Sequence, residues 1–128
     1  RQLLAGLGHH VEPSHPAALD EVDVGQHSTA VWATYLTHLL DEIAPALIGR
    51  PVTADDVDPL NWALAELGRG VSVSRYLSAT MALAGHTRRV AQWWADGMDV
   101  LVTPTLPEPP PPLGTFRPDD PDPGGHEG

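Results

Sequence analysis

Histidine is the residue type in this chain best suited to bind a metal, because neutral imidazole is a common ligand. The seven histidines are His9, His10, His15, His27, His38, His86 and His126. No two of them are four residues apart, the spacing that places two imidazoles on one helix face. His38, Asp41 and Glu42 could share a helix face, but such a group is more typical of a solvated surface. We therefore predict no metal site and no cofactor, with a small metallo-hydrolase as an alternative hypothesis.

The serines could act as nucleophiles if a neighbouring base activated one of them. The chain has five: Ser14, Ser28, Ser72, Ser74 and Ser78. None lies in a Gly-x-Ser-x-Gly elbow or a Ser-x-x-Lys motif. Ser28, Ser72 and Ser74 precede helical patterns, where a hydroxyl typically caps the first N–H groups. The acidic clusters 20–23 and 55–58 also flank helix starts, where carboxylates interact favourably with the positive end of the helix dipole. The sequence predicts no catalytic residue.

Three helical patterns would have to position any site. The first runs from about Ser28 to Gly49 and contains Pro45, where we expect a kink or an early end. The second opens at Asp58-Pro59 with an N-cap and a proline at the first position, and ends at Gly68 or Gly70. The third starts after Ser72 or Ser74 and continues to about Gly97. It carries two apolar faces, so we expect it to be covered on two sides.

Two segments are predicted to be strands. Residues 100–103 form a short, continuous apolar run, typical of a strand inside a sheet covered by helices. Residues 9–12 could form an edge strand that the following prolines stop. One or two strands do not make a sheet, and residues 1–8 resemble the last two turns of a longer amphipathic helix, with Gly8 as its C-cap. The predicted fold class is an α/β fragment that is predominantly helical, and we expect it to belong to a larger protein.

Composition limits the partners. The net charge is −10, with seven Arg and no Lys, which disfavours nucleic-acid and membrane-surface roles because such a surface repels phosphate. No cysteine is present, so disulfides and thiolate chemistry are excluded, as suits a cytoplasmic protein. The apolar runs are too short for a transmembrane span.

Several blocks, in the order of the chain, resemble one enzyme family, the amidase signature hydrolases. They are residues 3–12, 56–69, 76–79, 88–94 and 99–114, and together the resemblance covers about residues 1–116. The most specific is the last, Asp-Val-Leu-Val-Thr-Pro-Thr-Leu-Pro-Glu-Pro-Pro-Pro-Pro-Leu-Gly. The resemblance is nearest to a branch of the family that includes a cyclic-dimer hydrolase.

The resemblance implies an α/β enzyme with a mixed central sheet wrapped by helices. It also implies amide hydrolysis by a Ser–cis-Ser–Lys triad with a glycine- and serine-rich oxyanion loop. This chain has no lysine and no such loop, so no catalytic residue carries over. A wall of the substrate pocket can carry over: Thr103, Pro104 and Thr105 would lie at the carboxyl end of a strand, where α/β sheets bind ligands. Trp32 is a fourth candidate for this pocket.

We therefore expect residues 1–116 to be a partial amidase-signature domain without its catalytic core, and 117–128 to be a flexible tail rich in Pro, Asp and Gly. The domain would supply helices and part of the pocket for a small amide substrate. Its partner would be the remainder of the enzyme or a second copy. The alternative function is a non-catalytic helical module that self-associates. Pro109–Pro112 leaves a further alternative, a ligand for an SH3- or WW-type domain.

Overall fold

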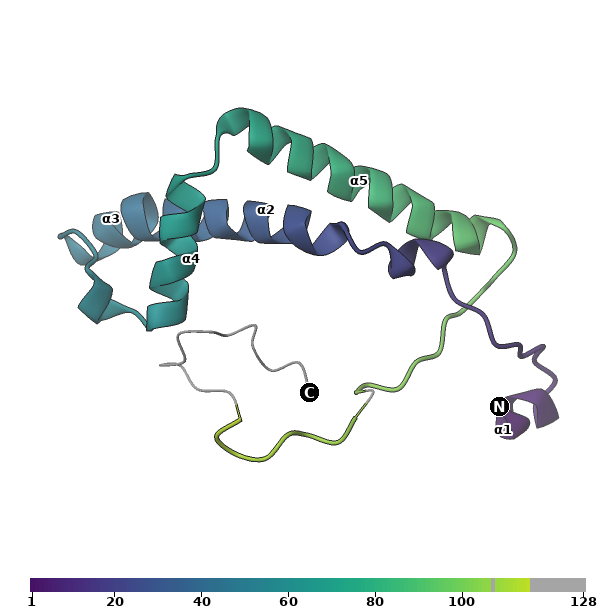
Figure 1. Cartoon of the computed structure of the whole chain (residues 1–128). Helices are drawn as coiled ribbons and strands as arrows, with labels where there is room; N and C mark the ends of the chain where they lie inside the picture. The colour runs from purple at the N-terminus through teal and green to yellow at the C-terminus, as the bar shows by residue number, and fades with distance from the viewer. Residues whose placement is uncertain (107, 116–128) are drawn as a thin grey trace.

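The computed structural model of the chain describes residues 1–106 and 108–115, and every regular element within these ranges is helical. Figure 1 shows the arrangement, in which α2 and α5 run side by side and α4 crosses α2. The α-helices are α1 (Gln2–Gly6), α2 (Val24–His38), α3 (Ala44–Ile48), α4 (Pro59–Arg69) and α5 (Val73–Ala95). Shorter turns are η1 (Ala17–Asp20), η2 (Leu39–Ile43) and η3 (Ala54–Asp56).

The strands expected at residues 9–12 and 100–103 are wrong, and with them the α/β fold class. The described residues contain no strand. A strand exists only when a neighbouring strand accepts and donates its backbone hydrogen bonds. Of the described backbone groups, none pairs with those of residues 100–103, and in residues 9–12 only the His9 N–H is bonded, to the carbonyl of Leu4. An apolar run of strand-like composition thus stays unpaired.

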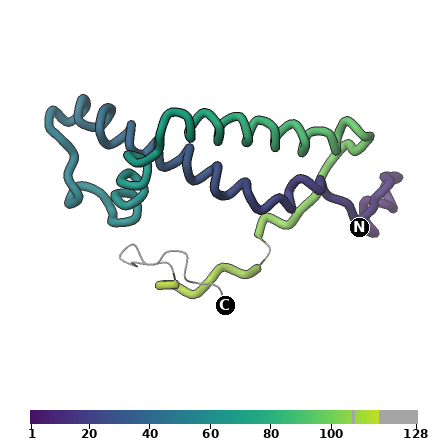
Figure 2. Tube along the Cα trace, turned by 45° about the horizontal axis from the view of Figure 1, so that its top comes forward, coloured from purple at the N-terminus to yellow at the C-terminus, as the bar shows by residue number. Residues whose placement is uncertain are grey.

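Helices α2 and α3 form one long, nearly continuous rod, visible in both views (Figure 2). Between them η2 is a π-helical turn, directly before Ala44-Pro45. Proline lacks an N–H and its ring collides with the carbonyl four residues earlier in an α-helix, so a wider turn accommodates it. The rod ends at Gly49, whose φ of 76° places it in the left-handed region. The expected disturbance at Pro45 is therefore confirmed, in the form of a π turn.

Side-chain caps define the starts of α4 and α5, as predicted. The Asn61 N–H donates to the Asp58 carboxylate at 3.0 Å, and Pro59 occupies the first helical position. The Arg75 N–H donates to the Ser72 hydroxyl at 3.1 Å. These local signals place both helices within two residues of their expected limits.

The core lies where α4 crosses α2. Leu36, Leu40 and Ala65 are buried together, and further apolar side chains pack around them. The close approach depends on Gly68, because a Cβ there would lie 2.1 Å from the carbonyl oxygen of Ala33. The Thr37 hydroxyl joins the two helices, lying 2.8 Å from the Ala65 carbonyl oxygen and 3.1 Å from that of Ala33.

The described residues cover helix α5 on one side only, so the second covered face expected from the sequence stays a prediction. Ala79 is buried, and Tyr76 and Leu83 face α2. The opposite apolar residues, among them Val73 and Met81, are exposed. No described helix is long and apolar enough to cross a membrane. The predicted tail, residues 117–128, lies outside the described residues.

Candidate functional site

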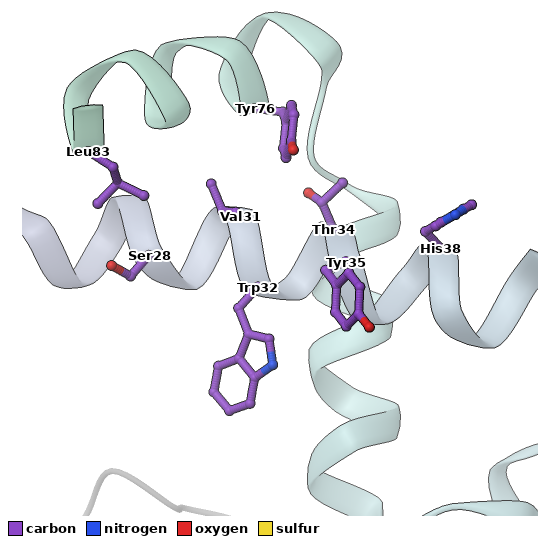
Figure 3. Close-up of a pocket in the computed structure, with 8 residues that line it drawn as sticks. All are labelled: Ser28, Val31, Trp32, Thr34, Tyr35, His38, Tyr76 and Leu83. Atoms are coloured by element: carbon purple, nitrogen blue, oxygen red, sulfur yellow. The ribbon is translucent and has the colours of Figure 1, made fainter. Parts of the chain in front are cut away.

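A groove of about 630 Å³ lies along α2 on the side that meets α5 (Figure 3). Its wall consists mainly of aromatic and aliphatic side chains, with a few polar groups among them. The lining residues are Ser28, Val31, Trp32, Thr34, Tyr35, His38, Tyr76 and Leu83. Two helices far apart in sequence therefore build the groove.

The groove's side chains do not all converge on one point. Figure 3 shows Tyr76 and Leu83 pointing from α5 toward α2, where Val31 and Thr34 point back at them. Trp32 points away from α5, and Tyr35, one helical turn further along α2, lies across the helix between the two directions. The indole of Trp32 is half exposed, so the groove offers open aromatic surface that an apolar group could cover.

The polar groups of the groove do not form a catalytic arrangement. The Thr34 hydroxyl donates to the Ala30 carbonyl at 2.8 Å and is therefore engaged by its own helix. Within the described residues, neither Ser28 nor His38 makes a side-chain hydrogen bond, so no base is in place to activate a hydroxyl. Chemically, the groove can bind an apolar group but lacks an activated nucleophile.

A charged cluster at the start of α2 ties that end of the chain to α5. The Arg89 guanidinium donates two hydrogen bonds to the Glu21 carboxylate, at 2.8 and 2.5 Å, and His86 Nδ1 lies 3.2 Å from the same carboxylate. These bonds, from Arg89 first and then His86, lower the pKa of Glu21 from 4.5 to about 2. A carboxylate so stabilised in its charged form is a weak base, and its ion pairs join the segment before α2 to α5.

Asp41, one of the acids on the His38 face, is also paired. Arg69 of α4 donates to its carboxylate at 3.0 and 2.5 Å, which lowers the pKa of Asp41. The same arginine lies 5.1 Å from the ring centre of Trp62, in a cation–π contact. Nowhere in the described ranges do three His, Asp or Glu side chains gather in a way that could hold a metal ion.

The four predicted pocket residues are not brought together. Trp32 lines the groove, whereas Thr103, Pro104 and Thr105 lie exposed in the segment after α5 and do not line it. Sequence reasoning missed Tyr35 and Tyr76 as groove residues. Tyr76 has the helical spacing of one of the two apolar faces of α5, but no local pattern indicates that it meets α2.

Comparisons with known proteins relate the chain to much longer hydrolases. No family model matches the chain. It is 28% identical over 111 residues to the 6-aminohexanoate-cyclic-dimer hydrolases of Paenarthrobacter ureafaciens and of Pseudomonas sp. (strain NK87). Each match covers 87% of this chain and 22% of the relative. The chain is homologous to these hydrolases.

Solved structures give the same result. The structure of a 6-aminohexanoate cyclic dimer hydrolase matches with a TM-score of 0.86 and 26% identity, over 93% of this chain and 25% of that one. A substrate complex of such a hydrolase matches with a TM-score of 0.83 and 28% identity, over 88% and 23%. The predicted resemblance to a cyclic-dimer hydrolase is confirmed, while membership of the amidase signature family stays a prediction. The chain spans about a quarter or less of the length of these relatives.

Proposed function

We propose that this chain forms part of an amide hydrolase, supplies scaffold helices and part of the substrate pocket, and does not hydrolyse amides by itself. The supporting observation is the TM-score of 0.86 over 93% of the chain to a solved 6-aminohexanoate cyclic dimer hydrolase. Helices α2, α4 and α5 are thus arranged as in one section of that enzyme.

The chemistry of the chain supports the lack of independent activity. The sequence has no lysine, the base of the triad expected from the family resemblance. No hydroxyl among the groove residues is hydrogen-bonded to a base, as described above. The chain would then act by shape: Trp32, Thr103, Pro104 and Thr105 would contact the substrate, a small amide, once the rest of the enzyme is present. A cytoplasmic location stays a prediction.

A chimaeric enzyme tests the proposal. The matched 111-residue region of the Paenarthrobacter ureafaciens hydrolase would be replaced by the corresponding residues of this chain. Release of amines from the 6-aminohexanoate cyclic dimer would then be measured for the chimaera and for the isolated 128-residue chain. We expect hydrolysis by the chimaera alone. A folded but inactive chimaera, or an active isolated chain, would contradict the proposal.

Within the active chimaera, Trp32→Ala tests the pocket. Removing the indole takes apolar surface from the substrate, so KM should rise about tenfold, which corresponds to about 1.4 kcal/mol of lost binding. Leu47→Ala serves as the control, because Leu47 is an exposed apolar residue of α3 outside the groove. Equal KM values for the two variants would remove Trp32 from the pocket.

The second candidate function is the self-associating helical module, and the exposed apolar side chains of α5 favour it. Such side chains gain about 25 cal/mol for each Å² of apolar surface removed from water. Light scattering at rising concentrations of the isolated chain separates the two functions. A mass that grows with concentration supports self-association, and a constant 13.7 kDa monomer contradicts it.

A further inference from the structure

The exposed side of α5 forms a continuous apolar surface with one arginine inside it. We call this the outer face of α5 and define it by residues spaced three, four or seven positions apart. They are Val73, Leu77, Met81, Ala84, Arg88, Ala91 and Trp94. At 3.6 residues per turn this spacing places them along one side of the helix. Val73, Leu77 and Met81 are 76%, 54% and 74% exposed, so the described residues leave most of the face uncovered.

Arg88 has an unusual position within this face. Helix α5 carries three arginines and no acid over its 23 residues, although the whole chain has a net charge of −10. Arg89 pairs with Glu21, while Arg88 forms no ion pair with any described residue. It follows Ala84 by one helical turn and is exposed. A guanidinium inside an apolar surface requires a carboxylate when that surface is covered, because an unpaired buried charge is costly.

We propose that the outer face of α5 packs against an apolar segment of the same hydrolase, beyond these 128 residues, that places a carboxylate against the Arg88 guanidinium. This inference rests on the proposed function and names the contact through which the chain would join the rest of the enzyme. An arginine fits this role because its planar guanidinium binds a carboxylate through two parallel hydrogen bonds.

A second copy of the chain fits the face less well. Two outer faces packed together would contain two arginines and no carboxylate, since α5 has no acidic residue. Both guanidinium groups would lose water without gaining a partner. Two chains of net charge −10 also repel each other at long range. The charge pattern therefore favours a partner with the opposite charge at this point.

The chain contains no cysteine, so one cysteine on the outer face reports whether the face is covered. Met81→Cys would be labelled with a thiol reagent in the isolated chain and in the chimaeric hydrolase, with peptide mass spectrometry to identify the site. We expect labelling to be at least about tenfold slower in the chimaera. In the isolated chain the rate should not depend on protein concentration.

Charge reversal tests the carboxylate. In the chimaera, Arg88→Glu should raise the labelling rate of Met81→Cys by about tenfold or more, because two carboxylates would then repel each other across the contact. Arg75→Glu is the matched control: Arg75 lies on α5, is exposed and has no ion pair with any described residue. It sits two positions from both Val73 and Leu77 and so lies off the outer face. That variant should leave the labelling rate unchanged.

The outcomes separate the two proposals. Equal effects of Arg88→Glu and Arg75→Glu in an active chimaera overturn this inference and leave the proposed function intact. So does a Met81→Cys that is labelled equally fast in the active chimaera and in the isolated chain. If labelling of Met81→Cys in the isolated chain slows as the protein concentration rises, a second copy covers the face, and the inference is also overturned. A chimaera that folds without activity removes the proposed function, and the inference with it.

Discussion

The two contacts of this helical layer differ in how completely they are made. Where α4 crosses α2, Leu36, Leu40 and Ala65 are buried, and Gly68 lets the backbones approach. Along α5, one side meets α2 while the outer face is left exposed. The first contact buries its apolar side chains within the chain. The outer face of α5 instead leaves its apolar side chains exposed to water.

This difference shows which part of the chain is self-sufficient. A contact that buries its side chains contributes to stability in the isolated chain, whereas exposed apolar residues contribute only when a partner covers them. The same residue type should therefore respond differently to truncation in the two regions. Matched substitutions in the two contacts measure that difference directly.

Leucine truncation should give the largest effect. Leu36→Ala removes a side chain that is 8% exposed and leaves a cavity, so the free energy of unfolding should fall by about 3 kcal/mol. Leu77→Ala on the outer face removes one that is 54% exposed, and it should change that free energy by less than about 0.5 kcal/mol. Urea unfolding followed by circular dichroism measures both. Equal losses would mean that the outer face is covered in the isolated chain.

Glycine substitution should give the next largest effect. Gly68→Ala puts a Cβ 2.1 Å from the Ala33 carbonyl oxygen and 2.3 Å from Thr37 Oγ1, so the helices must separate, at a cost of about 2 kcal/mol. Gly85→Ala in α5 puts a Cβ near the ends of two arginine side chains only, Arg89 at 3.3 Å and Arg88 at 3.9 Å. It should stabilise the chain by about 0.5–1 kcal/mol, because alanine favours helix over glycine. A tolerated Gly68→Ala would show that the crossing is looser than described.

These two contacts also explain what could be predicted from the sequence. Caps such as Asp58 and Ser72 act on backbone groups two or three residues away, so their helices were placed correctly. The Gly68 crossing depends on Ala33, 35 positions earlier, and no local pattern connects the two. The leucines at 60, 64 and 67 have the spacing of an apolar stripe on α4, yet the buried residues of this helix are Ala65 and Gly68. Small residues at a close crossing carry little periodic signal.

Residues 100–103 show a different kind of limit. Their apolar run correctly indicates surface that favours burial, but pairing as a strand requires a neighbour from another segment. No described segment supplies one. The candidate pocket has the same limit. Trp32 was predicted as a pocket residue, but its neighbours in the groove come from α2 and α5, whose relative position depends on tertiary contacts. Local signals thus predicted the helices well, but they predicted strands that lack partners and gave little information on long-range contacts.

The hydroxyl that joins α2 to α4 should have a smaller effect. Thr37→Val keeps the shape of the side chain and removes the bond to the Ala65 carbonyl, which should lower the free energy of unfolding by about 1 kcal/mol. Thr80→Val is the control on α5, since the Thr80 hydroxyl donates only to Tyr76 of its own helix. The difference between the two variants isolates the contact between helices. Equal free energies of unfolding for the two variants would mean that packing alone stabilises the crossing of α2 and α4.

The ion cluster that ties Glu21 to α5 should have the smallest effect, because the Glu21 and Arg89 side chains are partly exposed to solvent. Its signature is a dependence on pH. The pKa of Glu21 is lowered to about 2 in the folded chain from 4.5, so the unfolded chain binds the proton more readily. The stabilisation is therefore fully present above about pH 4.5 and is lost as the pH falls toward 2. Glu21→Gln should weaken the fold at pH 7 and make little difference near pH 2.

Glu42→Gln controls for the general effect of removing a charge, because the Glu42 carboxylate makes no ion pair within the described residues. Urea unfolding of the unmodified chain and both variants at pH 7 and near pH 2 gives the comparison. A Glu21→Gln loss that is the same at both pH values would show that the carboxylate acts through shape rather than charge. A pH-dependent loss would instead make the inner side of α5 an electrostatic contact, while its outer face depends on apolar cover and the single charge of Arg88.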